Sequence, residues 1–156
     1  MANTHGDTGV AAVGALDTAF LERLPGYLAR RAAAAIIVHF GRHLKGMDLR
    51  PAEFAALSLI GHNPGITARQ LCGELDMAPP NVAKIIKGFE GRNLIERSQH
   101  PTDGRAVGLE LTRAGTTLLA RAEPAALAAD RAGTAALTTR EEATLRRLLR
   151  KVYQGR

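Results

Sequence analysis

One stretch of the sequence, residues 67–111, constrains the fold most strongly, because its hydrophobic pattern changes there from helical to extended. Thr67 followed three residues later by Gln70 has the spacing of a capping box, which marks the start of a helix. A turn separates this short helix from a second one that opens at Pro79, since proline suits the first turn of a helix. The apolar residues of the second helix recur at three- and four-residue steps: Val82, Ile85, Ile86 and Phe89. The second helix therefore has one face to bury and leaves its opposite face free.

After residue 93 the apolar residues alternate with polar ones, which is typical of β-strands. We expect strands over residues 94–98 and 106–111. The segment between them contains Pro101 and the turn dipeptide Asp103-Gly104, so the two strands should form a hairpin. A short helix, a tight turn, a longer helix and a hairpin, in this order, predict a winged helix-turn-helix.

On the N-terminal side, a helix is expected to open at Leu24-Pro25 and to run to about Lys45, where Gly46 stops it. Another helix begins near Pro51. The first of these helices carries an apolar stripe at helical spacing, so we expect one of its faces to be buried. The stripe consists of Leu24, Leu28, Ala32, Ala35, Ile36, His39, Phe40 and His43. Residues 1–15 show no periodicity and are expected to form a flexible arm.

On the C-terminal side, Thr112 is a typical N-cap for a long helix that runs to about Ala129. Thr139 with Glu142 three residues later predicts the capping box of a last helix. The predicted fold is therefore mainly α with a small β-hairpin wing.

The charge balance permits a nucleic-acid partner but does not locate it. The chain of 156 residues carries a net charge of +6. Residues 67–113 contain seven basic and six acidic residues, so this region contributes little to the excess. Residues 21–50 and 140–156 each contain six basic and two acidic residues. The excess positive charge therefore lies on the flanking helices, where it could steer the protein toward DNA or attract an anionic ligand.

Several classes of protein are not favoured by the sequence. The longest unbroken apolar run, Ala32–Val38, is far shorter than the roughly 20 residues of a membrane helix, so no membrane partner is expected. The N-terminus has no signal-peptide pattern, and a single cysteine suits a reducing compartment, which together predict a cytoplasmic protein. No phosphate-binding glycine loop or nucleophile motif is present, so neither an enzyme nor a bound cofactor is expected.

The sequence closely resembles the MarR family of bacterial transcriptional regulators over roughly residues 20–153. The resemblance is carried by five segments in a fixed order: 49–54 (Leu-Arg-Pro-Ala-Glu-Phe), 64–67 (Pro-Gly-Ile-Thr), 94–97 (Leu-Ile-Glu-Arg), 101–105 (Pro-Thr-Asp-Gly-Arg) and 111–115 (Leu-Thr-Arg-Ala-Gly). It implies a homodimer that binds a pseudo-palindromic operator in double-stranded DNA. It also implies a winged DNA-binding region at residues 49–115 and a helical dimerisation region at residues 16–48 and 116–156.

Candidate DNA contacts lie on the free face of the second helix, where Asn81 and Lys84 can bond base edges or phosphates and Lys87 adds a nearby charge. In the wing, Arg105 is placed to enter the minor groove, and the resemblance implies that Asp103 positions it. The full set of predicted DNA-binding residues is Thr67, Arg69, Asn81, Lys84, Lys87, Asp103 and Arg105.

The resemblance further implies a repressor that a small ligand releases, with an aromatic acid or its CoA thioester as the expected effector. The candidate ligand-binding residues are Tyr27, Arg30, Arg31, His39, His43 and Phe54. The candidate dimerisation residues are Leu21, Leu24, Leu145, Leu148, Leu149 and Val152.

Two alternatives stay open from the sequence. His39 and His43 lie one helical turn apart, which is a spacing for metal ligands, but no third ligand is evident nearby. A metal-responsive regulator is therefore an alternative, although no metal site is predicted. The other alternative is a winged helix that binds only protein.

Overall fold

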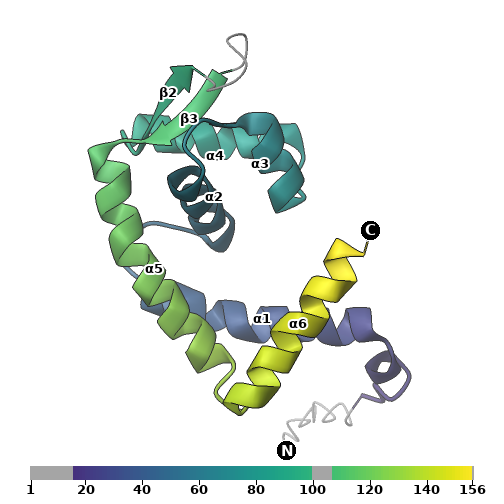
Figure 1. Ribbon diagram of the computed structural model, residues 1–156. Helices are drawn as coiled ribbons and strands as arrows, with labels where there is room; N and C mark the ends of the chain where they lie inside the picture. The colour runs from purple at the N-terminus through teal and green to yellow at the C-terminus, as the bar shows by residue number, and fades with distance from the viewer. Residues whose placement is uncertain (1–15, 100–106, 156) are drawn as a thin grey trace, which may run out of the picture. The chain divides into compact units, whose positions relative to one another are not determined.

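The computed structural model describes residues 16–99 and 107–155. The elements in chain order are η1 (Leu21–Arg23), α1 (Pro25–His43), α2 (Pro51–His62), β1 (Ile66–Thr67), α3 (Ala68–Leu75), α4 (Pro79–Gly91), β2 (Ile95–Gln99), β3 (Val107–Leu111), α5 (Arg113–Gly133) and α6 (Thr139–Gln154) (Figure 1). This mainly helical architecture with a small antiparallel sheet confirms the predicted fold class. Within the described ranges, no helix combines the length and the hydropathy that crossing a membrane requires.

The chain divides into two compact parts between Ala33 and Ala34, within α1. In the first part, the Tyr27 ring lies beneath two guanidinium groups, with Arg30 and Arg31 at 5.6 and 5.9 Å from the ring centroid. The Arg31 Nη1 also donates a hydrogen bond of 3.2 Å to the Tyr27 hydroxyl. Both contacts have the distance of a cation–π pair.

The core of the second part lies where α2, α3 and α4 pack together. Its largest fully buried side chains are Leu57, Ile60, Leu71, Val82 and Phe89. They come from all three helices, so the burial of apolar surface, the main favourable term in folding, joins these helices into one unit.

A three-stranded antiparallel sheet closes this unit, in the order β1-β3-β2. The hairpin pairs Ile95 with Leu111 and Gln99 with Val107, which confirms the predicted strands to within one residue at each end. The sequence pattern did not predict β1, because a two-residue strand is too short to show an alternation. Ile66 pairs with Leu109 and thereby attaches the start of α3 to the hairpin.

The start of α5 is fixed against the hairpin by two hydrogen bonds of one threonine, which confirms the predicted N-cap. The Thr112 hydroxyl accepts a bond of 3.1 Å from the Gly115 N–H and donates one of 2.7 Å to the Asn93 carbonyl. The Thr112 N–H donates to the Leu94 carbonyl at 3.0 Å. Gly115 packs so closely on this strand entrance that a Cβ there would lie 2.0 Å from the Leu94 oxygen. The helix can therefore take this position only with glycine at residue 115.

Two predicted helix ends need correction. Helix α1 ends at His43 rather than at Lys45, and Gly46 follows with a φ of +84°. Helix α5 continues past Ala129 to Gly133, although Pro124 removes one backbone donor from its interior. Burial of Ala122 and Ala129 on one face of α5 holds the helix on both sides of the proline.

The capping box of α6 lies one residue earlier than predicted, at Thr138 and Glu141 rather than at Thr139 and Glu142. Both pairs have the required spacing, but the backbone is extended at Thr138, which makes that residue the N-cap. The backbone N–H and the hydroxyl of Thr138 both donate to the Glu141 carboxylate, and they hold the pKa of this exposed group below its usual value.

The expected burial of the α1 face is not found in the single chain, where no residue of α1 is buried. Leu24 and Leu28 are 41% and 47% exposed, and within α1 only Tyr27, Ile36, His39 and Phe40 are half-buried. Apolar side chains at helical spacing indicate a face that needs a partner, but the pattern does not say whether the same chain supplies it.

The contact between Gly115 and Leu94 predicts a strong effect on stability. Gly115→Ala should lower the free energy of unfolding by about 2–3 kcal/mol, because the new methyl group meets backbone rather than a movable side chain. Urea denaturation followed by circular dichroism measures this. Gly73→Ala in α3 is the matched control, because a Cβ there meets nothing within 4 Å. This substitution should raise the free energy of unfolding by about 0.5–1 kcal/mol. Equal effects of the two substitutions would contradict this account.

Candidate nucleic-acid interface and interhelical cavity

Helices α3 and α4 are joined by a tight turn that the local sequence dictates. Asp76 ends α3 in the left-handed conformation, with a φ of +50°, and its N–H bonds the carbonyls of Cys72 and Gly73. Ala78 is extended, and Pro79 then occupies the first turn of α4, where its missing N–H costs nothing. The turn therefore reverses the chain within three residues and presents α4 as the second helix of a helix-turn-helix.

Helix α4 buries one face and exposes the other. Val82, Ile86 and Phe89 are 1%, 6% and 1% exposed. Lys84 lies two residues from both Val82 and Ile86, which is about 200° around the helix from each. Lys84 is therefore held on the side away from the core, and Asn81 and Lys87 are exposed as well. In the part of the chain that the structure describes, neither lysine forms an ion pair with an acidic side chain.

Thr67 caps α3, as its spacing from Gln70 predicted. The Thr67 hydroxyl accepts a bond of 3.3 Å from the Gln70 N–H and donates one of 2.8 Å to Gln70 Oε1, which also accepts from the Thr67 N–H. The hydroxyl is thus used within the chain, whereas Arg69, two residues later, is exposed.

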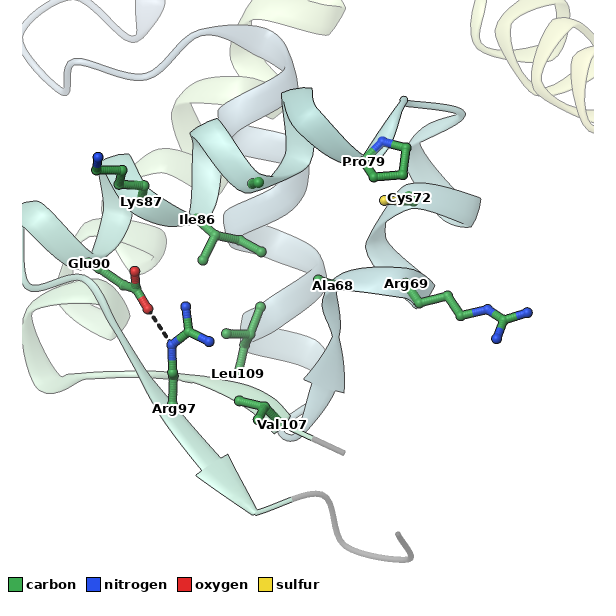
Figure 2. Close-up of a pocket in the computed structure, with 11 residues that line it drawn as sticks. Ala68, Arg69, Cys72, Pro79, Ile86, Lys87, Glu90, Arg97, Val107 and Leu109 are labelled. Atoms are coloured by element: carbon green, nitrogen blue, oxygen red, sulfur yellow. Dashed lines mark hydrogen bonds and ion pairs between the residues drawn. The ribbon is translucent and has the colours of Figure 1, made fainter. Parts of the chain in front are cut away.

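A cavity of about 680 Å³ lies between α3, α4 and the hairpin strands (Figure 2). Arg69 and Lys87 lie at opposite ends of it, and Arg69 extends away into solvent. On one wall, Arg97 Nε donates a bond of 2.7 Å to Glu90 Oε1. Cys72 is half-buried in another wall. The pairing of Glu90 with Arg97 leaves the two end cations as the positive charge of this surface.

Arg92, at the C-terminal end of α4, ties this helix to a distant segment of the chain, and no sequence pattern indicated this role. Its Nη1 donates to the Asp48 carbonyl at 2.6 Å and its Nη2 donates to the Met47 carbonyl at 3.0 Å. These bonds join the end of α4 to the segment between α1 and α2, more than 40 residues earlier. No local pattern could have indicated this role, because the partners are backbone carbonyls distant in sequence.

Two predicted wing residues, Asp103 and Arg105, lie outside the described residues, as does the turn between β2 and β3. The strands that carry this turn are described, so the position of the wing's base next to α4 is established (Figure 1).

A second cavity, here called the interhelical cavity, has a volume of about 510 Å³. Its walls come from α1, α2, α5 and α6, and they comprise Ile36, Ile37, Phe40, Phe54, Glu123, Ala126, Leu127, Ala129, Asp130 and Arg146. The rings of Phe40 and Phe54 lie 5.5 Å apart at 60°. Such a cavity, mostly apolar and with few charged groups, has the size and lining of a small-molecule site.

The charged groups in this lining are mostly acidic. Glu123 Oε1 lies 2.6 Å from His62 Nε2 at the end of α2, and the Ser58 hydroxyl donates to it at 3.4 Å. Asp130 adds a second carboxylate. Arg146 is the cation among these lining residues, and Glu142 on the preceding turn of α6 pairs with it.

Only one of the predicted ligand-binding residues, Phe54, lines this cavity. Tyr27, Arg30 and Arg31 belong to the first part of the chain and form the cation–π group described above. The His43 Nδ1 lies 2.9 Å from the His39 carbonyl, so this ring bonds within its own helix. Among the described residues no three His, Cys, Asp or Glu side chains are grouped as metal ligands.

Three lining residues with charge, Glu123, Asp130 and Arg146, were missed by the sequence analysis. Arg146 lies in residues 140–156, for which the sequence indicated only an excess of positive charge. The two acidic residues lie seven residues apart on α5, which places them on one face, but nothing local indicates that this face borders a cavity.

These observations define a winged helix-turn-helix protein, a class that includes many regulators of transcription. Residues 49–107 match the sequence profile of the MarR family. A protein of Thauera aromatica named for transcriptional regulation of the hcr operon is 31% identical over 130 residues, which are 83% of this chain and 78% of that protein. The chain therefore belongs to the MarR family of transcriptional regulators.

Solved structures agree with this assignment. The transcriptional repressor CouR, bound to a 23-mer DNA duplex, is 28% identical with a TM-score of 0.78, covering 89% of this chain and 99% of that one. A MarR family protein of Mycobacterium tuberculosis in complex with salicylic acid is 26% identical with a TM-score of 0.68, covering 83% of this chain and 96% of that one.

The capping role of Thr67 predicts a loss of stability when its hydroxyl is removed. Thr67→Ala should lower the free energy of unfolding by about 1 kcal/mol, because the Gln70 N–H loses its acceptor. Thr67→Ser keeps the hydroxyl and should lower the free energy of unfolding by less than Thr67→Ala does. Chemical denaturation of both variants measures the difference, and an unchanged stability in Thr67→Ala would show that the cap contributes nothing.

Proposed function

We propose that this regulator is a dimeric, sequence-specific DNA-binding repressor that a small aromatic ligand releases from its operator. The observation that carries the DNA-binding part is the exposed face of α4, where Asn81, Lys84 and Lys87 stand opposite a fully buried apolar face. A helix held in this way can enter the major groove while Arg69 and the predicted wing residue Arg105 meet phosphate or the minor groove.

The exposed apolar surface of the terminal helices supports a dimer. Leu148, Leu149 and Val152 are 46%, 45% and 76% exposed, and Leu145 is half-buried on the same face of α6. Near the N-terminus, Leu21 and Leu24 are 40% and 41% exposed. Contiguous exposed apolar side chains on helices mark an interaction surface. A second copy covering them would place two winged units for half-sites about one DNA turn apart, roughly 34–36 Å.

The division of labour that we propose follows these surfaces. Residues 49–115 form the DNA-binding region and residues 16–48 and 116–156 form the dimerisation region. The interhelical cavity lies between α5 of the dimerisation region and α2 of the DNA-binding region. A ligand in it would therefore contact both regions. The complex of a relative with salicylic acid supports an aromatic ligand for this fold.

A contact at the wall of this cavity provides a route for release. Glu123 lines the cavity and bonds His62, the last residue of α2. The chain then passes through Asn63–Gly65 to β1 and to the start of α3. A ligand that changes the position of Glu123 therefore acts on the segment that leads to the helix-turn-helix, and it favours a dimer with misplaced recognition helices.

The DNA-binding proposal predicts a salt effect at one residue. Lys84→Ala should weaken binding to the DNA that flanks the protein's own gene, and it should reduce the slope of log K against log salt by about one if Lys84 meets a phosphate. Fluorescence anisotropy over a series of salt concentrations measures both. Arg131→Ala on α5 is the control, since it removes one exposed charge outside the winged region. Equal binding by wild type and Lys84→Ala would favour a winged helix that binds protein.

The dimer proposal predicts the effect of one exposed apolar residue. Val152→Glu should raise the dissociation constant of the dimer at least about tenfold, because a carboxylate would be buried without a partner. The side chain is 76% exposed in the single chain, so the fold of each protomer should be unaffected. Analytical ultracentrifugation measures the change. Thr144→Glu, at an exposed position of the same helix, should leave the dimer intact, and a wild-type protein that sediments as a monomer would overturn the proposal.

A further inference from the structure

The chain passes twice between the DNA-binding region and the dimerisation region that we propose. The first passage is the segment between α1 and α2, and the second is the start of α5. Three consecutive residues at the C-terminal end of α4 are bonded to both passages: Arg92, Asn93 and Leu94. The end of α4 is therefore the point at which both connections between the two regions are held.

The first passage is a sharp bend between two buried side chains. Leu44 and Leu49 are 3% and 8% exposed and belong to the core. Between them, Gly46 and Asp48 both have left-handed backbone, with φ of +84° and +48°. A residue with a side chain keeps this conformation only where its surroundings hold it. Within the described residues, the backbone of the bend has one bond of its own, from the Met47 N–H to the Leu44 carbonyl.

Arg92 supplies the partner that the bend lacks. Its Nη1 donates to the Asp48 carbonyl and its Nη2 donates to the Met47 carbonyl, at 2.6 and 3.0 Å. The guanidinium is a rigid planar fork, so bonds to two adjacent carbonyls fix both the side chain and the course of the bend. The Asp48 carboxylate adds little, because it lies 3.7 Å from Nη1 and its side chain is 93% exposed.

The second passage is bonded to the next two residues. The Asn93 carbonyl accepts a bond of 2.7 Å from the Thr112 hydroxyl, and the Leu94 carbonyl accepts one of 3.0 Å from the Thr112 N–H. The backbone N–H of Arg92 bonds the last turn of α4. Because these three residues continue directly from α4, a bond at either passage acts on the end of this helix.

We propose that Arg92 is a positioning residue for operator binding. Its two bonds to the bend hold α4 in the orientation in which the two winged units of a dimer fit their half-sites, and Arg92 needs no contact with DNA for this role. Without these bonds, the end of α4 loses one of its two connections, and its orientation has to be regained on the DNA at a cost in affinity. This inference rests on the proposed DNA-binding dimer.

The first test needs no DNA. Arg92→Met keeps the apolar stem and removes the donors, so hydrogen exchange of the full-length protein, followed by mass spectrometry, should be faster at residues 45–50. Peptides from the core of α2 should exchange as in wild type. Asp48→Asn is the matched control, because it removes the carboxylate, keeps the carbonyl and suits left-handed backbone. Equal exchange of the bend in Arg92→Met and wild type would overturn the proposal.

The second test measures binding to the DNA that flanks the protein's own gene, trimmed to the segment that wild type protects. In fluorescence anisotropy, Arg92→Met should bind about tenfold more weakly, with the same slope of log K against log salt as wild type, because no phosphate contact is lost. Insertion of one base pair between the half-sites should cost this variant less affinity than it costs wild type, since its winged units are held less rigidly. Asp48→Asn should match wild type in all three measurements.

Arg92→Lys keeps the proposal testable if Arg92→Met does not fold. It retains the charge but replaces the fork by one ammonium, so it should bind DNA more weakly than wild type. Full affinity in Arg92→Lys would show that the charge is needed and the two bonds are not.

Two other results would also contradict the proposal. A salt slope reduced by about one in Arg92→Met would assign Arg92 to a phosphate. Affinity and spacing dependence equal to those of wild type would show that the bonds do not position α4. If wild type does not bind this DNA, the proposed function fails, and hydrogen exchange still decides whether Arg92 holds the bend.

Discussion

The burial of one face of α4 is the interaction on which the arrangement of the winged unit depends. Val82, Ile86 and Phe89 join the helix to the core formed with Leu57 and Leu71 of α2 and α3, among other residues. Because a helix is rigid over this length, fixing three residues on one side also fixes the direction of every side chain on the other. The exposed cations of α4 thus have a defined orientation that no contact of their own provides.

The start of α5 is attached to the same unit, so the winged unit also fixes where this helix begins. Thr112 and Gly115 attach this helix to the entrance of β2, and the glycine allows an approach that any side chain would prevent. Further along, α5 comes close to α1 at Gly133, where a Cβ would lie 2.9 Å from the Ile36 Cα. Helix α5 therefore connects the hairpin, the wall of the interhelical cavity and α1. A single helix of this kind connects the wall of the cavity to the winged unit.

Local chemistry predicted most of the elements. The capping pair Thr67 and Gln70, the proline at the start of α4 and the cap at Thr112 each act over three or four residues, and each is found in the structure. The capping box of α6 was placed one residue late, because two overlapping Thr-x-x-Glu pairs satisfy the same spacing and only the backbone angle distinguishes them. The two-residue strand β1 could not be predicted, since its pairing partner lies more than 40 residues away.

The candidate DNA contacts followed from the sequence because helical periodicity relates Lys84 to Val82 and Ile86 without any tertiary information. The interhelical cavity did not follow from it. Phe54, Glu123 and Arg146 come from three helices, and they border one cavity only because those helices pack together. The sequence by itself determined the winged helix-turn-helix and the exposed face of its second helix, since both depend on short-range spacing. Only the tertiary structure decided which charges line the cavity, because these side chains are brought together by the burial of apolar surface far from them in the chain.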